Sequence, residues 1–326
     1  MENHQILQLK KLGVNEILKE AIKIPFKSPK FIFLAFLTSL PLIFIMVLHE
    51  FILLTSIVET KSLLTPPPPS SDYFENIYYY RRSYMLYDSE LETIIMLFRN
   101  MSPRILQLAF LYLVPLHLLD LLNTIITIHS TCTLYSERPI QVKEMLLIPI
   151  RKTRFTGPLV TSLYVLFLNT FILFGLAWLV TNTYLSPFGI VFMIIYGVGS
   201  IILTLKWMEW SAVWNMSTVF SVLEERHGFA ALGASGYISR GNRGRGLQLM
   251  LLFYVWRILL RLSCHYVGGH DSWVGLVTAS FLSCVGNVMK WVVCTVYFYD
   301  CKKRTFEKKV DVEQGDVGKD AKAEPT

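Results

Sequence analysis

The sequence has few charged residues for its length. Asp, Glu, Lys and Arg make up 17% of the 326 residues, whereas 53% are hydrophobic. A soluble domain usually carries about 25% charged residues, so this composition argues against a water-soluble fold. The hydrophobic residues also occur in blocks of about 20 or more, the length that a helix needs to cross a bilayer. We therefore expect an all-α, polytopic membrane helical bundle.

Cysteine pairs and catalytic motifs are missing as well. The five cysteines include no CxxC pair and no histidine at ligand spacing, which argues against a disulfide framework or a zinc site. The HExxH, GxSxG and histidine-box patterns of membrane hydrolases and desaturases do not occur. We therefore expect no catalytic residue, no cofactor and no metal ligand, and a protein that is not an enzyme.

The sequence shows no pattern typical of a cleavable signal peptide. Its first apolar block begins at Phe31, is too long for a signal peptide and lacks a small-residue cleavage site, so we expect a signal anchor. The net charge of +7 would suit nucleic acid, but the basic residues cluster at the ends of apolar blocks. There they orient the chain and contact anionic headgroups, so the expected partner is the lipid bilayer and not nucleic acid.

The apolar blocks predict six transmembrane helices within a membrane domain over residues 31–300. The spans cover about 31–58, 105–135, 158–183, 187–210, 247–267 and 273–299. No helix breaker follows the fourth span before Gly228, so we expect that helix to extend beyond the bilayer.

Lys and Arg residues are concentrated in every second connection between the spans. Residues 1–30, the segments after spans two and four, and the tail from Lys302 are basic. The turns at 184–187 and 268–272 contain neither Lys nor Arg. Because basic segments stay in the cytosol, we expect both termini there, in the endomembrane system or the plasma membrane.

Two segments in the N-terminal half of the chain lie outside the predicted spans. Residues 1–30 form a cytosolic segment with an amphipathic helix over 14–23, which we expect to lie in the headgroup plane and to be broken by Pro25 and Pro29. The loop over 59–104 is predicted to be non-cytosolic and has a glycosylation sequon at Asn100.

The C-terminal segment over 301–326 is rich in charge and lacks aromatic residues after Phe306. Such a composition is typical of disorder, so we predict a disordered cytosolic tail. Cys301 lies at its start beside Lys302 and is a candidate palmitoylation site.

Ionisable residues within the predicted spans are the main functional signal. Because a charge in hydrocarbon is costly, such residues usually face a partner or a polar cavity. They are Glu50, His117, Asp120, Arg257, Arg261 and Lys290. His117 and Asp120 begin a polar stripe that continues at intervals of three and four along span two.

The depth of these charges suggests how they pair. With a helical rise of about 1.5 Å per residue, Asp120 and Lys290 lie roughly 22 and 25 Å from the non-cytosolic surface. Glu50 and Arg261 both lie roughly 10 Å from it. We predict that Glu50 pairs with Arg261, and that Asp120 pairs with Lys290 or Arg257. The pairs either fix the register of the helices, the favoured interpretation, or line a path for a proton, ion or small solute.

A short helix is predicted between spans four and five, along the cytosolic surface. Its motif consists of Glu224, Glu225, Gly228, Ser235 and Gly241. We expect the two glutamates to meet Arg240 or Arg243 and the helix to cap the bundle as a structural clasp. The basic stretch from Gly241 to Gly246 lacks the Gly-Lys-Ser/Thr ending of a phosphate loop and is interpreted as a flexible joint.

Two stretches of sequence resemble a plant family of six-span membrane proteins with no assigned activity. They are 12–18 (LGVNEIL) with 24–29 (IPFKSP), and 222–225 (VLEE) followed by Gly228, Ser235 and Gly241. The second stretch is also distantly similar to the membrane domain beside some bacterial glycerophosphodiester phosphodiesterases. This resemblance covers the membrane bundle only, and the catalytic domain of those enzymes has no counterpart here, so it implies no activity.

Three functions are compatible with the sequence. The favoured one is a non-enzymatic membrane scaffold or organiser whose tails recruit a cytosolic protein. The alternative is a transporter or channel that uses the buried charges of spans one, two, five and six. A lipid-modifying enzyme is disfavoured because no nucleophile or metal set is recognisable.

Overall fold

The computed structural model is helical throughout the residues that it describes, which are 12–64, 112–137, 141–147, 152–185, 190–224, 226–267 and 273–320. No strand occurs in these ranges. The helices are α2 (Val14–Lys27), α3 (Pro29–Leu64), the π-helical turn η1 (Tyr112–Leu116), α5 (His117–Tyr135), α6 (Val142–Leu147), α7 (Lys152–Leu185), α8 (Ile190–Leu223), α9 (Gly228–Ile238), α10 (Arg243–Val267) and α11 (Trp273–Asp320). The prediction of an all-α fold is thereby confirmed.

Four stretches of helix are long and apolar enough to cross a membrane. They are Pro29–Ile52 in α3, Phe155–Thr183 in α7, Ile190–Leu223 in α8 and Val274–Glu307 in α11. α5 and α10 coincide with two further predicted spans but do not meet this standard. Both carry polar or charged side chains, such as Asp120 in α5 and Arg257 in α10, that lower their hydropathy.

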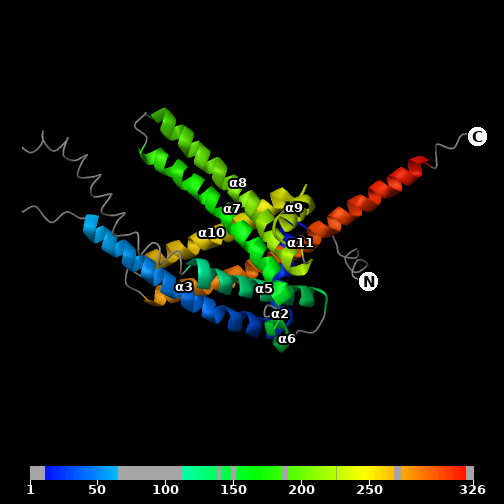
Figure 1. Cartoon of the computed structure of the whole chain (residues 1–326), viewed down its shortest axis with the longest axis horizontal. Helices are drawn as coiled ribbons and strands as arrows, with labels where there is room; N and C mark the ends of the chain where they lie inside the picture. Colours follow the sequence, from blue (N-terminus) through cyan, green and yellow to red (C-terminus); the bar gives the residue numbers. More distant parts are fainter. Residues whose placement is uncertain are drawn as a thin grey trace, which may run out of the picture.

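The helices form an elongated bundle around α11 (Figure 1). α11 packs against α2, α3, α5, α8 and α10, and α5 also lies against α3. α7 and α8 form the most extensive pair, and Figure 1 shows this hairpin diverging from α3 and α5 toward its loop end.

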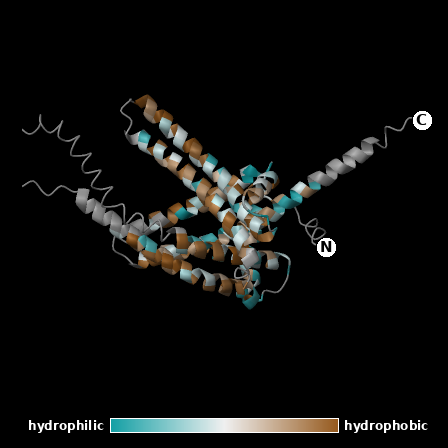
Figure 2. Ribbon diagram, in the orientation of Figure 1, coloured by the Kyte–Doolittle hydropathy of each residue, from teal (hydrophilic) through white to brown (hydrophobic). Residues whose placement is uncertain are grey.

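The α7–α8 hairpin exposes apolar side chains along its length. No residue in the most apolar window of either helix is buried within the protein. Phe171 and Phe174 are 62% and 72% exposed, and the hairpin is largely hydrophobic in Figure 2. Such a surface is stable only against other apolar groups, and acyl chains supply them when these helices cross a bilayer.

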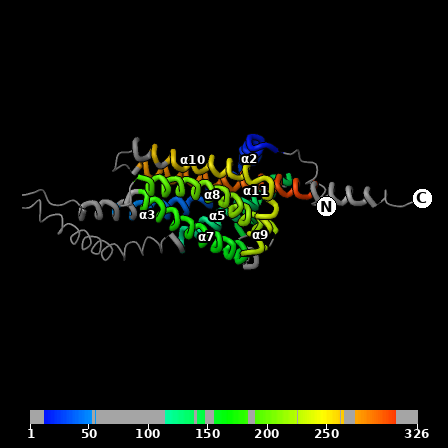
Figure 3. The backbone as a smooth tube through the Cα atoms, turned by 90° about the horizontal axis from the view of Figure 1, so that it is seen from above, coloured from blue at the N-terminus to red at the C-terminus, as the bar shows by residue number. Residues whose placement is uncertain are grey.

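The main buried cluster is built mainly from α2, α5, α8, α10 and α11, and α2 packs against α11 at this end of the bundle (Figure 3). Ile17 and Ile24 of α2 are fully buried there, beside Val219 of α8 and Val296 of α11. α2 begins at Val14, and the Glu16 carboxylate accepts a hydrogen bond from the Gly13 backbone N–H at 2.9 Å, which satisfies one donor at the helix start. α2 is therefore anchored to the bundle by packing of its apolar face.

The expected helix break at Pro25 is wrong, because α2 continues through Pro25 to Lys27. The lost backbone hydrogen bond at a proline is offset here by the burial of Ile17, Ala21 and Ile24, which are each 0% exposed. The chain instead turns at Ser28, which is extended, and Pro29 begins α3, where a missing N–H costs nothing.

The predicted disorder of residues 301–326 also differs from the structure, in which α11 continues to Asp320. Arg304 donates to the Asp300 carboxylate at 2.9 Å, and Lys303 and Glu307 form an ion pair at 3.7 Å one turn apart. These contacts support the helix past the apolar window. Residues 321–326 lie outside the described residues, as do 65–111, which hold most of the predicted 59–104 loop and Asn100.

Candidate functional site

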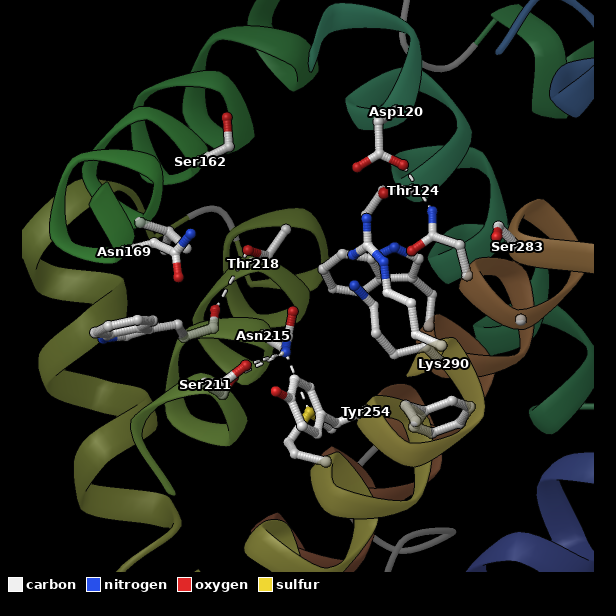
Figure 4. Close-up of a pocket in the computed structure, with 18 of the residues that line it drawn as sticks. Asp120, Thr124, Ser162, Asn169, Ser211, Asn215, Thr218, Tyr254, Ser283 and Lys290 are labelled. Atoms are coloured by element: carbon white, nitrogen blue, oxygen red, sulfur yellow. Dashed lines mark hydrogen bonds between the residues drawn. The ribbon is translucent and has the colours of Figure 1, made fainter. Parts of the chain in front are cut away.

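A cavity of about 420 Å³ lies inside the bundle, where α3, α5, α7, α8, α10 and α11 meet. This volume is within the range of about 300–1,000 Å³ that is typical of pockets for small molecules. Figure 4 shows polar side chains from several of these helices pointing into the space. α5, α10 and α11 each contribute at least one predicted intramembrane charge to the lining. The predicted charge of α3, Glu50, is not part of it.

The lining combines ionisable, polar and aromatic side chains. The ionisable residues are His117, Asp120, Arg257 and Lys290; the uncharged polar ones include Thr124, Ser162, Asn169, Ser211, Asn215, Thr218, Ser283 and Asn287; the aromatic ones are Trp207, Trp214, Trp256, Trp291, Phe253 and Tyr254. Four of the six predicted intramembrane charges therefore share one cavity.

Asp120 projects from α5 and accepts a hydrogen bond from the Asn287 amide of α11 at 2.6 Å (Figure 4). In the described part of the chain, no ion pair joins Asp120 to Lys290 or Arg257, so the predicted direct pairing is wrong. Asn287 lies one helical turn before Lys290 on the same face of α11 and reaches Asp120 first. Asp120 and Lys290 face the same cavity without touching.

The second predicted pair, Glu50 with Arg261, stays a prediction. Glu50 lies in α3 and Arg261 in α10, but the side chain of Arg261 is outside the described residues. Glu50 is not among the described residues that line the cavity.

His117 lies 3.2 Å from the Ser162 hydroxyl, measured from Nε2 to Oγ. Ser162 donates its own proton to the Leu159 carbonyl at 2.9 Å, so the imidazole donates to the serine oxygen. This hydrogen bond holds the imidazole ring against α7. It does not activate Ser162 as a nucleophile, because an activated serine donates its proton to the histidine. Sequence reasoning missed Ser162, because nothing in its local pattern separates it from other helical serines.

The predicted polar stripe of α5 continues inward from the cavity. Thr124, Thr127 and Thr131 are all at most 2% exposed, and Thr131 donates to the Thr127 carbonyl at 2.7 Å. The hydroxyls of Thr124 and Thr127 have no partner among the described residues. The stripe therefore adds hydrogen-bonding groups between the cavity and the end of the bundle that holds α2.

The clasp motif joins α7, α8 and α9. Gly228 has a φ of +57°, and its buried N–H donates to the Thr161 hydroxyl of α7 at 2.8 Å. The same hydroxyl lies 3.0 Å from Oγ of Ser221 in α8. Ser235 is fully buried on the inner side of α9, and Gly241 forms the turn after it with a φ of +85°.

The predicted pairing of Glu224 with Arg240 or Arg243 is wrong. Its carboxylate accepts from the Lys302 ammonium of α11 at 2.5 Å, whereas Arg243 lies 3.6 Å from Glu209. α11 is longer than the predicted sixth span and runs past the end of α8. Lys302 therefore lies within reach of Glu224. Glu225 is outside the described residues.

A buried ionic cluster around Asp300 was not predicted. Its carboxylate is 1% exposed and accepts from Arg245 of α10 at 2.8 Å and from Arg304 of α11 at 2.9 Å. It also accepts from the Leu12 backbone N–H at 3.0 Å, while both arginines donate to the Leu12 carbonyl. Arg245 lies in the stretch that was interpreted as a flexible joint, and the structure shows it fixed by these contacts instead.

Cys301 is fully buried within the core cluster, so its prediction as a palmitoylation site is wrong. An acyltransferase must reach the thiol, and an added acyl chain has no room in a packed interior. Continuation of α11 past the predicted sixth span places Cys301 in the core cluster, together with residues of α2, α8 and α10.

Comparison with known proteins gives a family but no activity. No curated protein and no solved structure matches the chain. The family model described as "Domain of unknown function (DUF8558)" matches residues 1–314, which include every residue found to line the cavity. Since this match covers nearly the whole sequence, the chain belongs to the DUF8558 family.

Proposed function

We propose that the protein is a membrane transporter that binds a small solute within its helical bundle and carries it across the bilayer. The observation that supports this function is the cavity of about 420 Å³, which is lined by Asp120, Arg257 and Lys290. Charges that only fix helix register are expected to contact one another, whereas these three surround an open space. The transport interpretation is therefore favoured over the purely structural one.

The proposal includes six spans, with α5 and α10 as the second and fifth. These helices lie within the bundle and line the cavity, so they can be more polar than helices that face lipid. The basic connections favour cytosolic termini, in the endomembrane system or the plasma membrane. The resemblance to plant six-span proteins and to the membrane domain beside bacterial glycerophosphodiester phosphodiesterases stays a prediction. A six-span arrangement is what that resemblance implies.

The proposed topology predicts that both ends of the chain are on one face of the membrane. Epitope tags at the two termini, on sealed vesicles of known orientation, are expected to be digested together by added protease or protected together. Protection of one tag and loss of the other would mean an odd number of spans and would contradict the proposal.

The transport proposal predicts that the cavity is reached from both sides of the membrane in turn. We expect Ser211→Cys to react with a membrane-impermeant thiol reagent added to either face of vesicles, because Ser211 lines the cavity. Labelling can be assigned to each cysteine by peptide mass spectrometry. Cys294 and Cys301, which are buried outside the cavity, serve as internal controls and are expected to stay unlabelled.

A membrane scaffold is the second candidate, and the length of α11 supports it. This helix extends beyond the other helices toward the C-terminus (Figure 1), where it is placed to meet a cytosolic protein. A scaffold needs no solute path, so it predicts that Ser211→Cys is unreactive from both faces. That result would replace the transporter proposal with the scaffold.

A further inference from the structure

The ammonium group of Lys290 lacks a polar partner in the described part of the chain. The Nζ atom lies 4.3 Å from the centroid of the Trp291 ring, and no hydrogen bond or ion pair to it is found among the described residues. A ring face stabilises a cation but satisfies none of its three N–H donors. Figure 4 shows Lys290 pointing into the cavity, so these donors are available to a ligand.

The charged groups of the lining do not balance. Lys290 and Arg257 contribute two positive charges and Asp120 contributes one negative charge. Asp120 is already engaged by the Asn287 amide. An uncompensated cation in a low-dielectric interior is costly, so a single anionic group in the cavity would stabilise the site.

The rest of the lining is suited to apolar and aromatic groups. Trp256 and Phe253 lie on the same helix as Arg257, and Trp291 is adjacent to Lys290. A small number of charged groups in a mostly apolar wall is typical of sites that orient an amphiphilic ligand. The volume is near the lower end of the usual range, so it fits one short chain better than a two-chain phospholipid.

We infer that the cavity binds a single-chain amphiphile with one anionic head group, such as a carboxylate or sulfate ester. The head group contacts Lys290 and Arg257, and the chain lies against Trp256 and Phe253. This inference names the solute class of the proposed transporter and rests on that proposal for its role.

A photoreactive decanoate with a diazirine on its chain tests the assignment in nanodiscs of phosphatidylcholine. Cross-links are expected on peptides of α8, α10 and α11 that line the cavity, as mapped by mass spectrometry. Unlabelled decanoate and decyl sulfate should compete, whereas decanol and decyltrimethylammonium should not. Equal competition by decanol would overturn the inference, because the anionic group would then contribute nothing.

Substitutions of Lys290 show whether its charge is responsible. Lys290→Met is expected to weaken competition by decanoate about tenfold or more, since a charge-assisted hydrogen bond is lost. Lys290→Arg should restore most of the affinity. Lys206→Met is the matched control, because Lys206 pairs with Glu209 outside the cavity, and it should bind as the unsubstituted protein does. Unchanged binding by Lys290→Met and by Arg257→Met would overturn the inference.

Two further comparisons complete the test. One distinguishes a free solute from a bilayer lipid as the ligand, and the other distinguishes failure of the ligand class from failure of the transport proposal. In the first, phosphatidylglycerol is included in the nanodiscs. If it competes with the photoreactive decanoate as effectively as free decanoate does, the anionic ligand comes from a bilayer lipid. Decanoate binding with an unreactive Ser211→Cys would leave a binding site without transport. A reactive Ser211→Cys that does not bind decanoate would retain the transport path and overturn the ligand class.

Discussion

Replacing Asp300 with alanine is expected to lower the free energy of unfolding by roughly 3–5 kcal/mol, the usual cost of removing one partner from a buried ion pair. The substitution leaves Arg245 and Arg304 without their shared carboxylate and the Leu12 N–H without an acceptor. The change can be measured by denaturant titration of the purified protein in detergent micelles. Tryptic cleavage within α2, after Lys19 or Lys23, is expected to increase in parallel.

Glu20→Ala is the matched control for Asp300→Ala. Glu20 also lies between two cations, Lys23 at 3.5 Å and Lys27 at 3.9 Å, but its side chain is 30% exposed. Exposed ion pairs contribute about 1 kcal/mol or less, so this variant should remain close to the unsubstituted protein. Equal stability losses in both variants would contradict the role of Asp300 as the anchor of the N-terminal segment.

Two glycines of the same helix are expected to respond in opposite directions to alanine. Gly228→Ala should destabilise the protein by about 1–2 kcal/mol, because a φ of +57° is unfavourable for a residue with a Cβ atom. The new Cβ would also lie 3.3 Å from the Tyr164 ring. Gly233 has no atom within 4 Å of such a Cβ, so Gly233→Ala should stabilise α9 by about 0.5–1 kcal/mol.

The thermal unfolding midpoints of the two variants provide the comparison. A lower midpoint is expected for Gly228→Ala and a higher one for Gly233→Ala. If both variants unfolded at the same temperature, the left-handed backbone at the start of α9 would not be a requirement of the fold.

The helical architecture was predictable because the apolar runs of this sequence are long. The ends of helices were less predictable, since burial decided them. Pro25 is compatible with α2 because Ile17, Ala21 and Ile24 are packed against other helices, and a single sequence does not show that packing. Likewise, the basic residues after Asp300 suggest an exposed tail, whereas Arg304 contacts a buried carboxylate.

The candidate site was predictable in its charges but not in its contacts. The cost of a buried charge singled out Asp120, Arg257 and Lys290 without any structure. Their partners depend on the rotation of each helix about its axis, which depth along the membrane does not determine. Asp120 therefore contacts Asn287, an uncharged neighbour of the predicted partner. Asp300 was missed because it borders the basic run that was assigned to the cytosol.

As a proposed membrane-spanning element, the α7–α8 hairpin is expected to make the protein sensitive to bilayer thickness. Each helix has 34 residues, which corresponds to a length of roughly 51 Å. The hydrocarbon core is about 30 Å thick, so a spanning hairpin must lean or protrude, and a thicker membrane holds it more upright. Ser162 and Asn169 of α7, and Trp207 of α8, line the cavity. A change in the lean of the hairpin would therefore move one wall of the cavity relative to α11.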